Sequence, residues 1–321
     1  MATSGSINFT ETSADIVTHS MILLGALHPE EVIATSTQNY AIEVLNKMIK
    51  AWVGKGINLW ALDRAALIFD NDVVKYVFHN KAGTGGTVAA GIKESGLVQT
   101  TLSAAEAAAQ TVLSVTSSTG MTAADKVIIE QDDGSRHEST IASVDSATQI
   151  TIDDALAAGS ASGSFVYAYT LTTDEIKHPE RILNVRLYNE DGNEIPMRKL
   201  SRQEYMNLSD KATEGSPYAY YFDKQLDNPT MYVYTEPSDL RESLRFDYLR
   251  TIEDIDSTTD NFFYPDEWLE AITYNLAVRL APAFGKDAKL QTLVPLAERF
   301  MDDAMSADQE DASTKFTPRI D

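Results

Sequence analysis

Apolar residues recur at helical spacing near the start of the chain. In residues 35–56, apolar and aromatic side chains fall about one turn apart, and two glycines end the pattern. They are Tyr40, Val44, Leu45, Met48, Ile49 and Trp52. Residues 13–27 have a similar spacing, with Ser13 at the expected N-cap and Gly25 near the end. The pattern predicts two N-terminal helices.

The same periodicity returns near the other end. In residues 265–285, Pro265 stands at the expected first helical position, acids occupy the first turn and Gly285 marks the end. One face carries Leu269, Ile272, Leu276, Leu280 and Ala283. Residues 288–306 predict a second helix that Pro295 kinks or delays. Two C-terminal helices are therefore expected.

Between these helices the pattern becomes that of strands. Residues 80–96, "NKAGTGGTVAAGIKESG", have no sustained periodicity and predict a linker or loop. Short β-branched runs separated by turn residues follow, at 110–117, 125–131, 138–145, 148–155 and 163–171. Strands at this spacing predict a small antiparallel sandwich or barrel. The block has the character of a β-module inserted into a host domain.

The host pattern resumes near Thr172. Residues 181–200 predict a hairpin with "NEDGNE" at its tip, and a short helix is expected to begin after the cap residue Ser201. Residues 217–237 and 242–251 predict three further strands, of which "LDNP" joins the first two.

The predicted fold class is therefore α+β. A helical core of two N-terminal and two C-terminal helices is combined with antiparallel hairpins and an inserted, small all-β domain. The predicted domains are a discontinuous core (1–80 and 172–308), the β-domain with its linker (81–171) and a C-terminal tail (309–321). The tail has no periodicity and is expected to order on a partner.

Composition narrows the function classes. The chain of 321 residues has no cysteine, which excludes disulfides, iron–sulfur clusters and a thiol nucleophile. Its formal charge of -22 argues against a surface that grips phosphates. No apolar run approaches the roughly 20 residues that span a bilayer, and the first residues do not resemble a secretory signal.

One stretch concentrates candidate chemistry. Residues 129–144, "IEQDDGSRHESTIASV", place two aspartates, a histidine and a glutamate close together. The EF-hand spacing is not met there or in "YNEDGNE", and Asp–Gly is a strong hairpin signal. The predicted interpretation is a hairpin tip of the β-module, formed by Asp132, Asp133 and Gly134.

The remaining motifs do not favour an enzyme. The five histidines, at positions 19, 28, 79, 137 and 178, have no metal-ligand spacing. The glycine run lacks the ending of a P-loop, and no G-x-S-x-G elbow is present. The tyrosine-rich residues 216–225 and 231–237 predict core or subunit-interface packing rather than a stacking platform. No catalytic residue, cofactor or metal site is expected.

Three segments carry a resemblance to a known family. The stretches "AWVGKGINLWAL", "PMRKLSRQEYMNL" and "PDEWLEAITYNLA" resemble the head-to-tail adaptor proteins, also called tail accessory or head completion proteins, of short-tailed podovirus-type phages. The resemblance covers residues 1 to about 80 and about 172 to 321. The middle block, with "DDG…H…TIASV", looks like a β-module of phage structural proteins, and smaller adaptors lack it.

The resemblance implies a structural connector in the virion, made in the host cytoplasm. It implies a dodecameric ring beneath the portal protein, through which DNA passes without specific binding. Tail nozzle or tail fibre proteins would dock on the ring, and no membrane would be involved. The expected portal-contacting residues lie in the tail: Lys315, Phe316, Thr317, Pro318, Arg319 and Ile320.

Two other functions stay open at this point. One is a virion-associated peptidoglycan hydrolase that uses a pair of carboxylates as acid and base. The other is a carbohydrate-binding role for the β-module alone.

Overall fold

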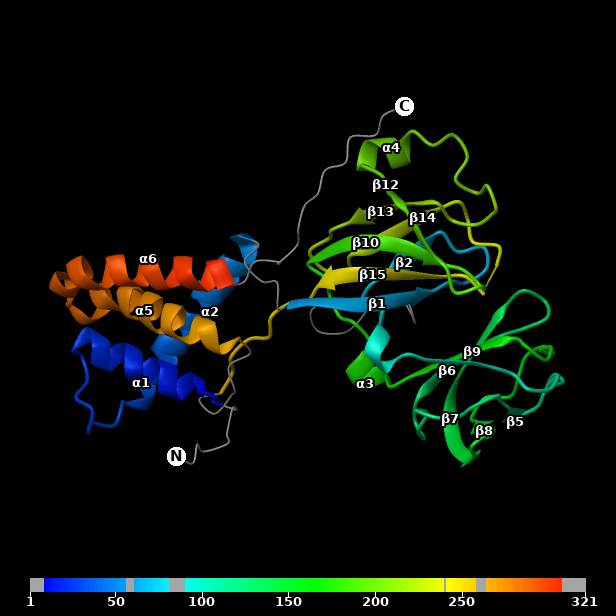
Figure 1. The fold of residues 1–321 in the computed structure, drawn as a ribbon, viewed down its shortest axis with the longest axis horizontal. Helices are drawn as coiled ribbons and strands as arrows, with labels where there is room; N and C mark the ends of the chain where they lie inside the picture. The colour runs from blue at the N-terminus through cyan, green and yellow to red at the C-terminus, as the bar shows by residue number, and fades with distance from the viewer. Residues whose placement is uncertain (1–8, 56–60, 81–89, 240, 258–263, 308–321) are drawn as a thin grey trace, which may run out of the picture. The chain divides into compact units, whose positions relative to one another are not determined.

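The computed structural model describes residues 9–55, 61–80, 90–239, 241–257 and 264–307 (Figure 1). It has the predicted mixed α+β fold. The chain forms two compact units, one from Met1–Ala61 with Ile252–Asp321 and the other from Leu62–Thr251. The predicted boundary of the adaptor core, 1–80 with 172–308, crosses both units and stays a prediction.

The first unit is helical and confirms the four predicted helices. They are α1 (Ser13–Leu24), α2 (Thr35–Lys55), α5 (Leu269–Leu280) and α6 (Leu290–Ala307), with short 3-10 turns at Asp266–Trp268, Ala281–Phe284 and Asp287–Lys289. Their apolar faces form one core, in which the rings of Trp52 and Trp268 lie 6.0 Å apart. The buried Ser20 hydroxyl donates to the Thr273 carbonyl at 2.9 Å and joins α1 to α5.

The N-cap of α1 differs from the prediction. Thr12, not Ser13, caps the helix, because its hydroxyl accepts from the Asp15 amide while the Asp15 carboxylate accepts from the Thr12 amide. The Ser13 side chain is buried instead and donates to the Ser257 carbonyl at 2.8 Å. Gly25 ends the helix with a φ of 69°, a left-handed conformation that favours glycine.

The second unit contains three sheets. The first has the order β11-β10-β15-β1-β3, the second β12-β13-β14-β2 and the third β4-β9-β6-β7-β8-β5. The strands of the first two are β1 (Leu62–Ile68), β2 (Lys75–Val77), β3 (Ile92–Lys93), β10 (Arg181–Tyr188), β11 (Glu194–Pro196), β12 (Arg198–Lys199), β13 (Ala219–Asp223), β14 (Thr230–Tyr234) and β15 (Ser243–Leu249). Those of the third are β4 (Val98–Thr101), β5 (Val112–Ser114), β6 (Lys126–Glu130), β7 (Arg136–Ser146), β8 (Gln149–Ile152) and β9 (Phe165–Tyr169). Two short helices complete the unit: α3 (Leu171–Asp174) and α4 (Arg202–Met206).

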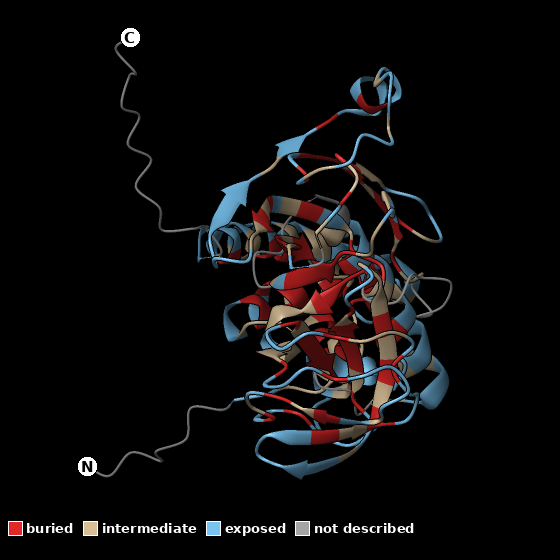
Figure 2. Cartoon of the chain, turned by 90° about the vertical axis from the view of Figure 1, so that its right-hand side faces the viewer, coloured by how far each residue is buried: buried red, intermediate tan, exposed pale blue. Residues whose placement is uncertain are grey.

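The first two sheets share one apolar core. Leu67 of β1 and Phe246 of β15 belong to the same buried cluster as Tyr220 of β13 and Met231 of β14. The predicted hairpin at 181–200 is confirmed as β10 and β11, and beyond Met197 the chain continues as β12 in the other sheet. Figure 2 shows buried residues along the central strands and exposed ones along the outer loops.

The third sheet curls so that its two end strands meet. Leu102 forms a bridge with Val115, and the Thr116 amide donates to the Thr101 carbonyl at 2.8 Å. The interior is filled by the apolar side chains of Leu102, Leu113, Val115, Met121, Val127, Ile129, Ile141, Ile150, Ile152, Leu156, Val166 and Ala168. This barrel-like sheet uses only strands between Val98 and Tyr169, all inside the block predicted as an inserted β-domain.

The prediction of a loop over residues 80–96 is wrong in its last part. Ile92 and Lys93 form β3 opposite Ala66 and Ala65 of β1, and Glu94–Gly96 form a 3-10 turn. Gly91 is needed because a Cβ there would stand 2.4 Å from Ile176. Strand formation here depends on β1, which lies far away in the sequence, so local composition does not reveal it.

Candidate functional site

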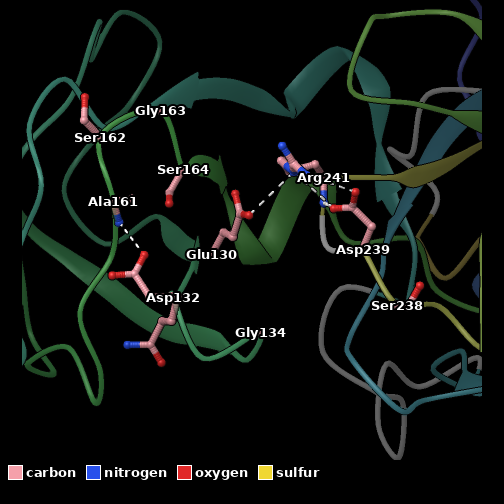
Figure 3. Close-up of a pocket in the computed structure, with 11 residues that line it drawn as sticks. Glu130, Asp132, Gly134, Ala161, Ser162, Gly163, Ser164, Ser238, Asp239 and Arg241 are labelled. Atoms are coloured by element: carbon pink, nitrogen blue, oxygen red, sulfur yellow. Dashed lines mark hydrogen bonds and ion pairs between the residues drawn. The ribbon is translucent and has the colours of Figure 1, made fainter.

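A cleft of about 550 Å³ lies beside the Asp–Gly turn singled out in the sequence (Figure 3). Three segments of the second unit form it: the β6–β7 turn, the loop before β9 and the segment before β15. The described lining residues are Glu130, Gln131, Asp132, Gly134, Ala161, Ser162, Gly163, Ser164, Ser238, Asp239 and Arg241. They are almost all polar or small.

Asp132, Asp133 and Gly134 lie in the turn between β6 and β7. Gly134 has a φ of 81°, which only glycine adopts without strain. The Asp133 carboxylate accepts from the Ser135 hydroxyl and amide, and these bonds lower the pKa of Asp133. The Asp132 carboxylate accepts from the Ala161 amide at 2.7 Å and so ties the turn to the loop before β9.

The cleft contains one guanidinium among several carboxylates. Arg241 lies 2.6 Å from Glu190, 3.2 Å from Asp239 and 3.8 Å from Glu130. Burial raises the pKa of Glu130, and the negative charges of Asp239 and Asp132 raise it further. The hydrogen bond from the Phe165 amide and the charge of Arg241 lower this pKa, but by less. Negative charge in the cleft therefore exceeds the positive charge that one arginine supplies.

The other polar residues of the stretch 129–144 point to separate places. His137 is buried, and its Nε2 lies 3.0 Å from the Asp154 carbonyl. Glu138 pairs with Arg136, away from the cleft lining. Within the described residues, no group of three or more His, Asp or Glu side chains has the arrangement of a metal site. The cleft residues instead hold turns and loops of the protein in place.

The barrel-like sheet packs on the first sheet of the same unit through an apolar cluster. Ala66 and Ile68 of β1 are buried against Ile128 of β6 and Tyr167 and Tyr169 of β9. Ile92 completes the buried set. Side chains of β1 therefore serve two cores, because Ala65 and Leu67 on its other face belong to the core between the first two sheets.

Two arginines with little exposed side chain, one from each of the two sheets, reinforce this contact. Arg136 of β7 donates from Nη1 to the Ile68 carbonyl at 3.1 Å, and its Nε lies 3.4 Å from Asp70. Its side chain is only 6% exposed, so the contact is shielded from water. An arginine of the barrel-like sheet thus inserts at the end of β1.

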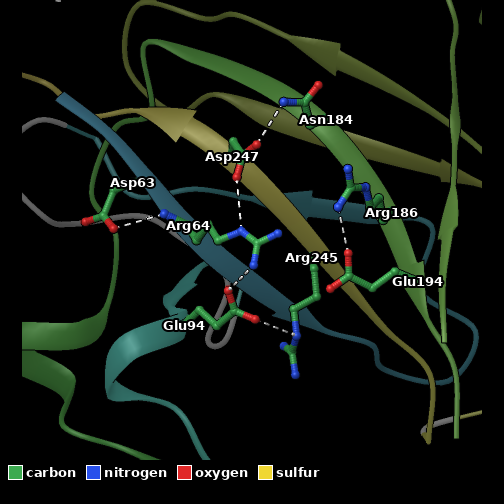
Figure 4. A network of polar contacts seen from close by, with 8 residues as sticks. All are labelled: Asp63, Arg64, Glu94, Asn184, Arg186, Glu194, Arg245 and Asp247. Atoms are coloured by element: carbon green, nitrogen blue, oxygen red, sulfur yellow. Dashed lines mark hydrogen bonds and ion pairs between the residues drawn. The ribbon is translucent and has the colours of Figure 1, made fainter. Parts of the chain in front are cut away.

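Arg245 of β15 reaches in the reverse direction. Its Nε lies 3.7 Å from Glu94 (Figure 4). Its Nη2 donates to Gln99 of β4, and its guanidinium stacks over the Tyr188 ring. Burial lowers the pKa of Arg245. Glu94 also pairs with Arg64, so one carboxylate links two strands of the first sheet. No local sequence signal marks Arg136 or Arg245.

A largely buried acid, Glu175, and His79 lie where the chain enters and leaves the block. Glu175 bridges to Ile92 through its backbone, and its carboxylate lies 3.4 Å from Nε2 of His79. Burial raises the pKa of Glu175 to about 7. Burial and the nearby Lys177 charge lower the pKa of His79, so near neutral pH the histidine does not neutralise an ionised Glu175.

We predict that Glu175→Gln stabilises the protein above about pH 7.5. Because the folded pKa of Glu175 lies above its ordinary value of 4.5, wild-type stability is full below pH 4.5 and falls as pH rises through 7. The expected gain in the free energy of unfolding is about 3 kcal/mol at pH 8 and close to zero at pH 4. Urea denaturation at both pH values measures it.

Glu267→Gln, at an exposed position, controls for the loss of one charge. An equal effect of Glu175→Gln at pH 4 and pH 8 would contradict the assignment of the effect to Glu175 ionisation.

The other predicted site residues are placed as follows. The six tail residues expected to contact the portal, from Lys315 to Ile320, lie outside the described residues. Tyrosines of the aromatic segments stack on the second sheet, where the rings of Tyr221 and Tyr232 lie 5.7 Å apart and α4 adds Tyr205. Buried His178 lies against the carbonyls of Gln225 and Leu226.

The charged and aromatic groups described above hold loops and sheets together. A comparison with protein families shows that the family model of the SU10 adaptor protein matches residues 99–319. This range exceeds half of the chain, and the chain belongs to the SU10 adaptor protein family, which is a family of structural phage adaptors. A comparison with curated proteins found no match.

The matched range differs from the resemblance seen in the sequence. It begins inside β4 and runs on through the barrel-like sheet, whereas the resemblance covered residues 1–80 and 172–321. In the described part of the chain, no helix is long and apolar enough to cross a membrane.

Proposed function

We propose that this protein is the head-to-tail connector of a podovirus-type virion. In this proposal, copies form a dodecameric ring beneath the portal and extend the channel through which DNA passes. The family match over residues 99–319 carries the proposal, because it assigns the chain to phage adaptors. The resemblance of the N-terminal helices to such adaptors supports it independently.

The charge of the chain supports a channel role without DNA binding. A formal charge of -22 gives a surface that repels phosphates, so DNA in transit would not be held by many contacts. The proposal includes no cofactor and no catalytic activity. In the cleft, Asp132 and Glu130 accept backbone hydrogen bonds, which is the use of a structural carboxylate rather than of a free acid–base pair.

The proposed partners are the portal above the ring and nozzle or fibre proteins below or beside it. The tail residues from Lys315 to Ile320 would bind the portal. Their apolar and basic side chains fit a segment that orders on a partner. Mixing the purified protein with its portal and imaging the complexes by electron microscopy tests ring formation and copy number directly.

We predict that removing residues 313–321 weakens portal binding by at least about tenfold, because the truncated chain loses the segment that folds on the portal. The free protein is expected to be monomeric in sizing experiments, since its acidic surface disfavours self-association. A chain with the same nine residues in scrambled order is the control for tail length and charge. An unchanged yield of portal complexes after truncation would rule out this role of the tail.

A further inference from the structure

One edge of the second unit combines positive charge with exposed apolar side chains. Lys199 of β12 and Arg202 of α4 are exposed, and neither forms an ion pair with a described residue. Met206 of α4 and Tyr218, which precedes β13, are 58% and 56% exposed. We name these four residues the cationic edge. Arginine, methionine and tyrosine are the residue types enriched in protein interfaces.

The local structure holds the cationic edge in place. Ser201 and Glu204 form a capping box at the start of α4, and Glu204 also accepts from Arg198 at 2.8 Å. Tyr205 packs the helix onto the second sheet by stacking on Tyr221 at 5.6 Å. Arg202 therefore projects from a fixed helix rather than from a loop.

The strand beside this edge is unsuited to pairing with a strand of another chain. The backbone amides of Met197 and Arg198 donate to the carbonyls of Val185 and Tyr218 within the sheets. The backbone nitrogens that face outward at this edge are therefore those of Pro196 and Lys199. Proline has no N–H to donate, and an edge lysine discourages strand addition. A partner would therefore be bound through side chains.

The cleft beside the β6–β7 turn has the complementary charge. Glu130, Asp132 and Asp239 line it, and the single guanidinium of Arg241 is shared with Glu190. Ser162, Gly163, Ser164 and Ser238 leave its remaining walls small, and a volume of about 550 Å³ accommodates long side chains. A second cation would offset the excess negative charge.

We propose that the cationic edge of one copy docks in the acidic cleft of the next copy in the ring. Both surfaces belong to the same unit of the chain and differ from each other. The contact is therefore heterologous, and heterologous contacts close into rings when the rotation between copies allows it. The occupant of the cleft is Lys199 or Arg202 of the neighbour. This inference rests on the proposed ring.

The contact accounts for assembly on a template. A few exposed ion pairs between proteins set register and encounter rate more than affinity, and salt weakens them. Such a contact is too weak to join free copies at ordinary concentration, and it becomes effective once the portal holds neighbours side by side. We expect adaptor occupancy of the portal to fall as salt rises.

Charge reversal of the edge tests the proposal. Lys199→Glu with Arg202→Glu is expected to lower the number of complete rings on the portal by at least about tenfold. Lys75→Glu with Lys289→Glu, which changes net charge equally at exposed positions elsewhere, is expected to leave ring yield unchanged. Circular dichroism checks that each variant is folded.

Neutralising the cleft tests the other half of the contact. Asp132→Asn with Asp239→Asn keeps acceptors for the Ala161 amide and Arg241, and is expected to lower ring yield similarly. The edge variant keeps an unchanged cleft, and the cleft variant keeps an unchanged edge. In a mixture of the two, the edge of the cleft variant can therefore bind the cleft of the edge variant. A carbodiimide, which joins lysine to carboxylate as an amide, is expected to give more crosslinked dimers from the mixture on the portal than from either variant alone.

The outcomes separate this inference from the proposed function. If the wild-type protein and both double variants all form normal rings on the portal, the proposed contact between edge and cleft is wrong and the connector role stands. Failure of the wild-type protein to form any ring on the portal would overturn the connector role. Crosslinks from Lys199 to residues outside the cleft would place the neighbour elsewhere and also overturn the inference.

Discussion

Deleting residues 97–171 is expected to leave the second unit aggregated rather than as a smaller folded protein. The deletion removes Ile128, Tyr167 and Tyr169, which cover Ala66 and Ile68 of β1. Burial of each large apolar side chain is worth about 1.5–3 kcal/mol, so the loss approaches the entire stability of many domains. Arg245 also loses its bond to Gln99. Soluble yield and sizing chromatography measure the outcome.

The matched control for this deletion replaces two apolar residues of β1, which the deletion uncovers, by polar ones. Ala66→Ser with Ile68→Thr in the deletion chain reduces the exposed apolar surface and is expected to recover part of the soluble yield. A monomeric deletion chain with an unchanged denaturation midpoint would contradict the view that β1 needs the barrel-like sheet. Because deletion disturbs folding, a carbohydrate-binding role of the block is better tested with point variants on its surface.

Trp268→Ala is expected to destabilise the helical unit by about 3–5 kcal/mol. The side chain is 1% exposed and lies among the apolar faces of the helices, with Trp52 at 6.0 Å and Tyr264 at 6.2 Å between ring centroids. Removal of the indole leaves a cavity that the helices cannot close. Trp268→Phe keeps most of the volume and is expected to cost less than half as much.

Tryptophan emission isolates this effect. The three tryptophans of the chain, at positions 52, 60 and 268, all fall in the sequence ranges of the helical unit, and the other unit has none. In a urea titration, the midpoint of the emission change should lie at a lower urea concentration for Trp268→Ala than for the wild type. Equal midpoints for the variant and the wild type would show that Trp268 does not support the helical core.

The features that could be predicted from the sequence are those encoded by residues close together. Asp133 and Gly134 indicated a turn between strands, because Asp-Gly is one of the dipeptides that favour a tight hairpin turn. Ser201 indicated the start of α4, and the structure adds a capping box with Glu204 three residues further on. Helical periodicity located the four long helices for the same reason.

The features that were missed depend on distant partners. β3 forms because β1 offers Ala65 and Ala66 at its edge, and a glycine-rich segment does not reveal this. The roles of Arg136 and Arg245 follow from the packing of one sheet on another, and neither residue belongs to a motif. The cleft likewise combines Asp132 with Arg241, more than a hundred positions away.

The two-sided burial of β1 limits which substitutions this strand tolerates. A strand that covers one core alternates between apolar and polar residues, whereas Ala65, Ala66, Leu67 and Ile68 are all buried. A polar side chain at position 66 or 68 would therefore lie inside the contact between two sheets, without water to solvate it. These two positions of β1 should tolerate fewer polar substitutions than the matching positions of a strand that covers one core.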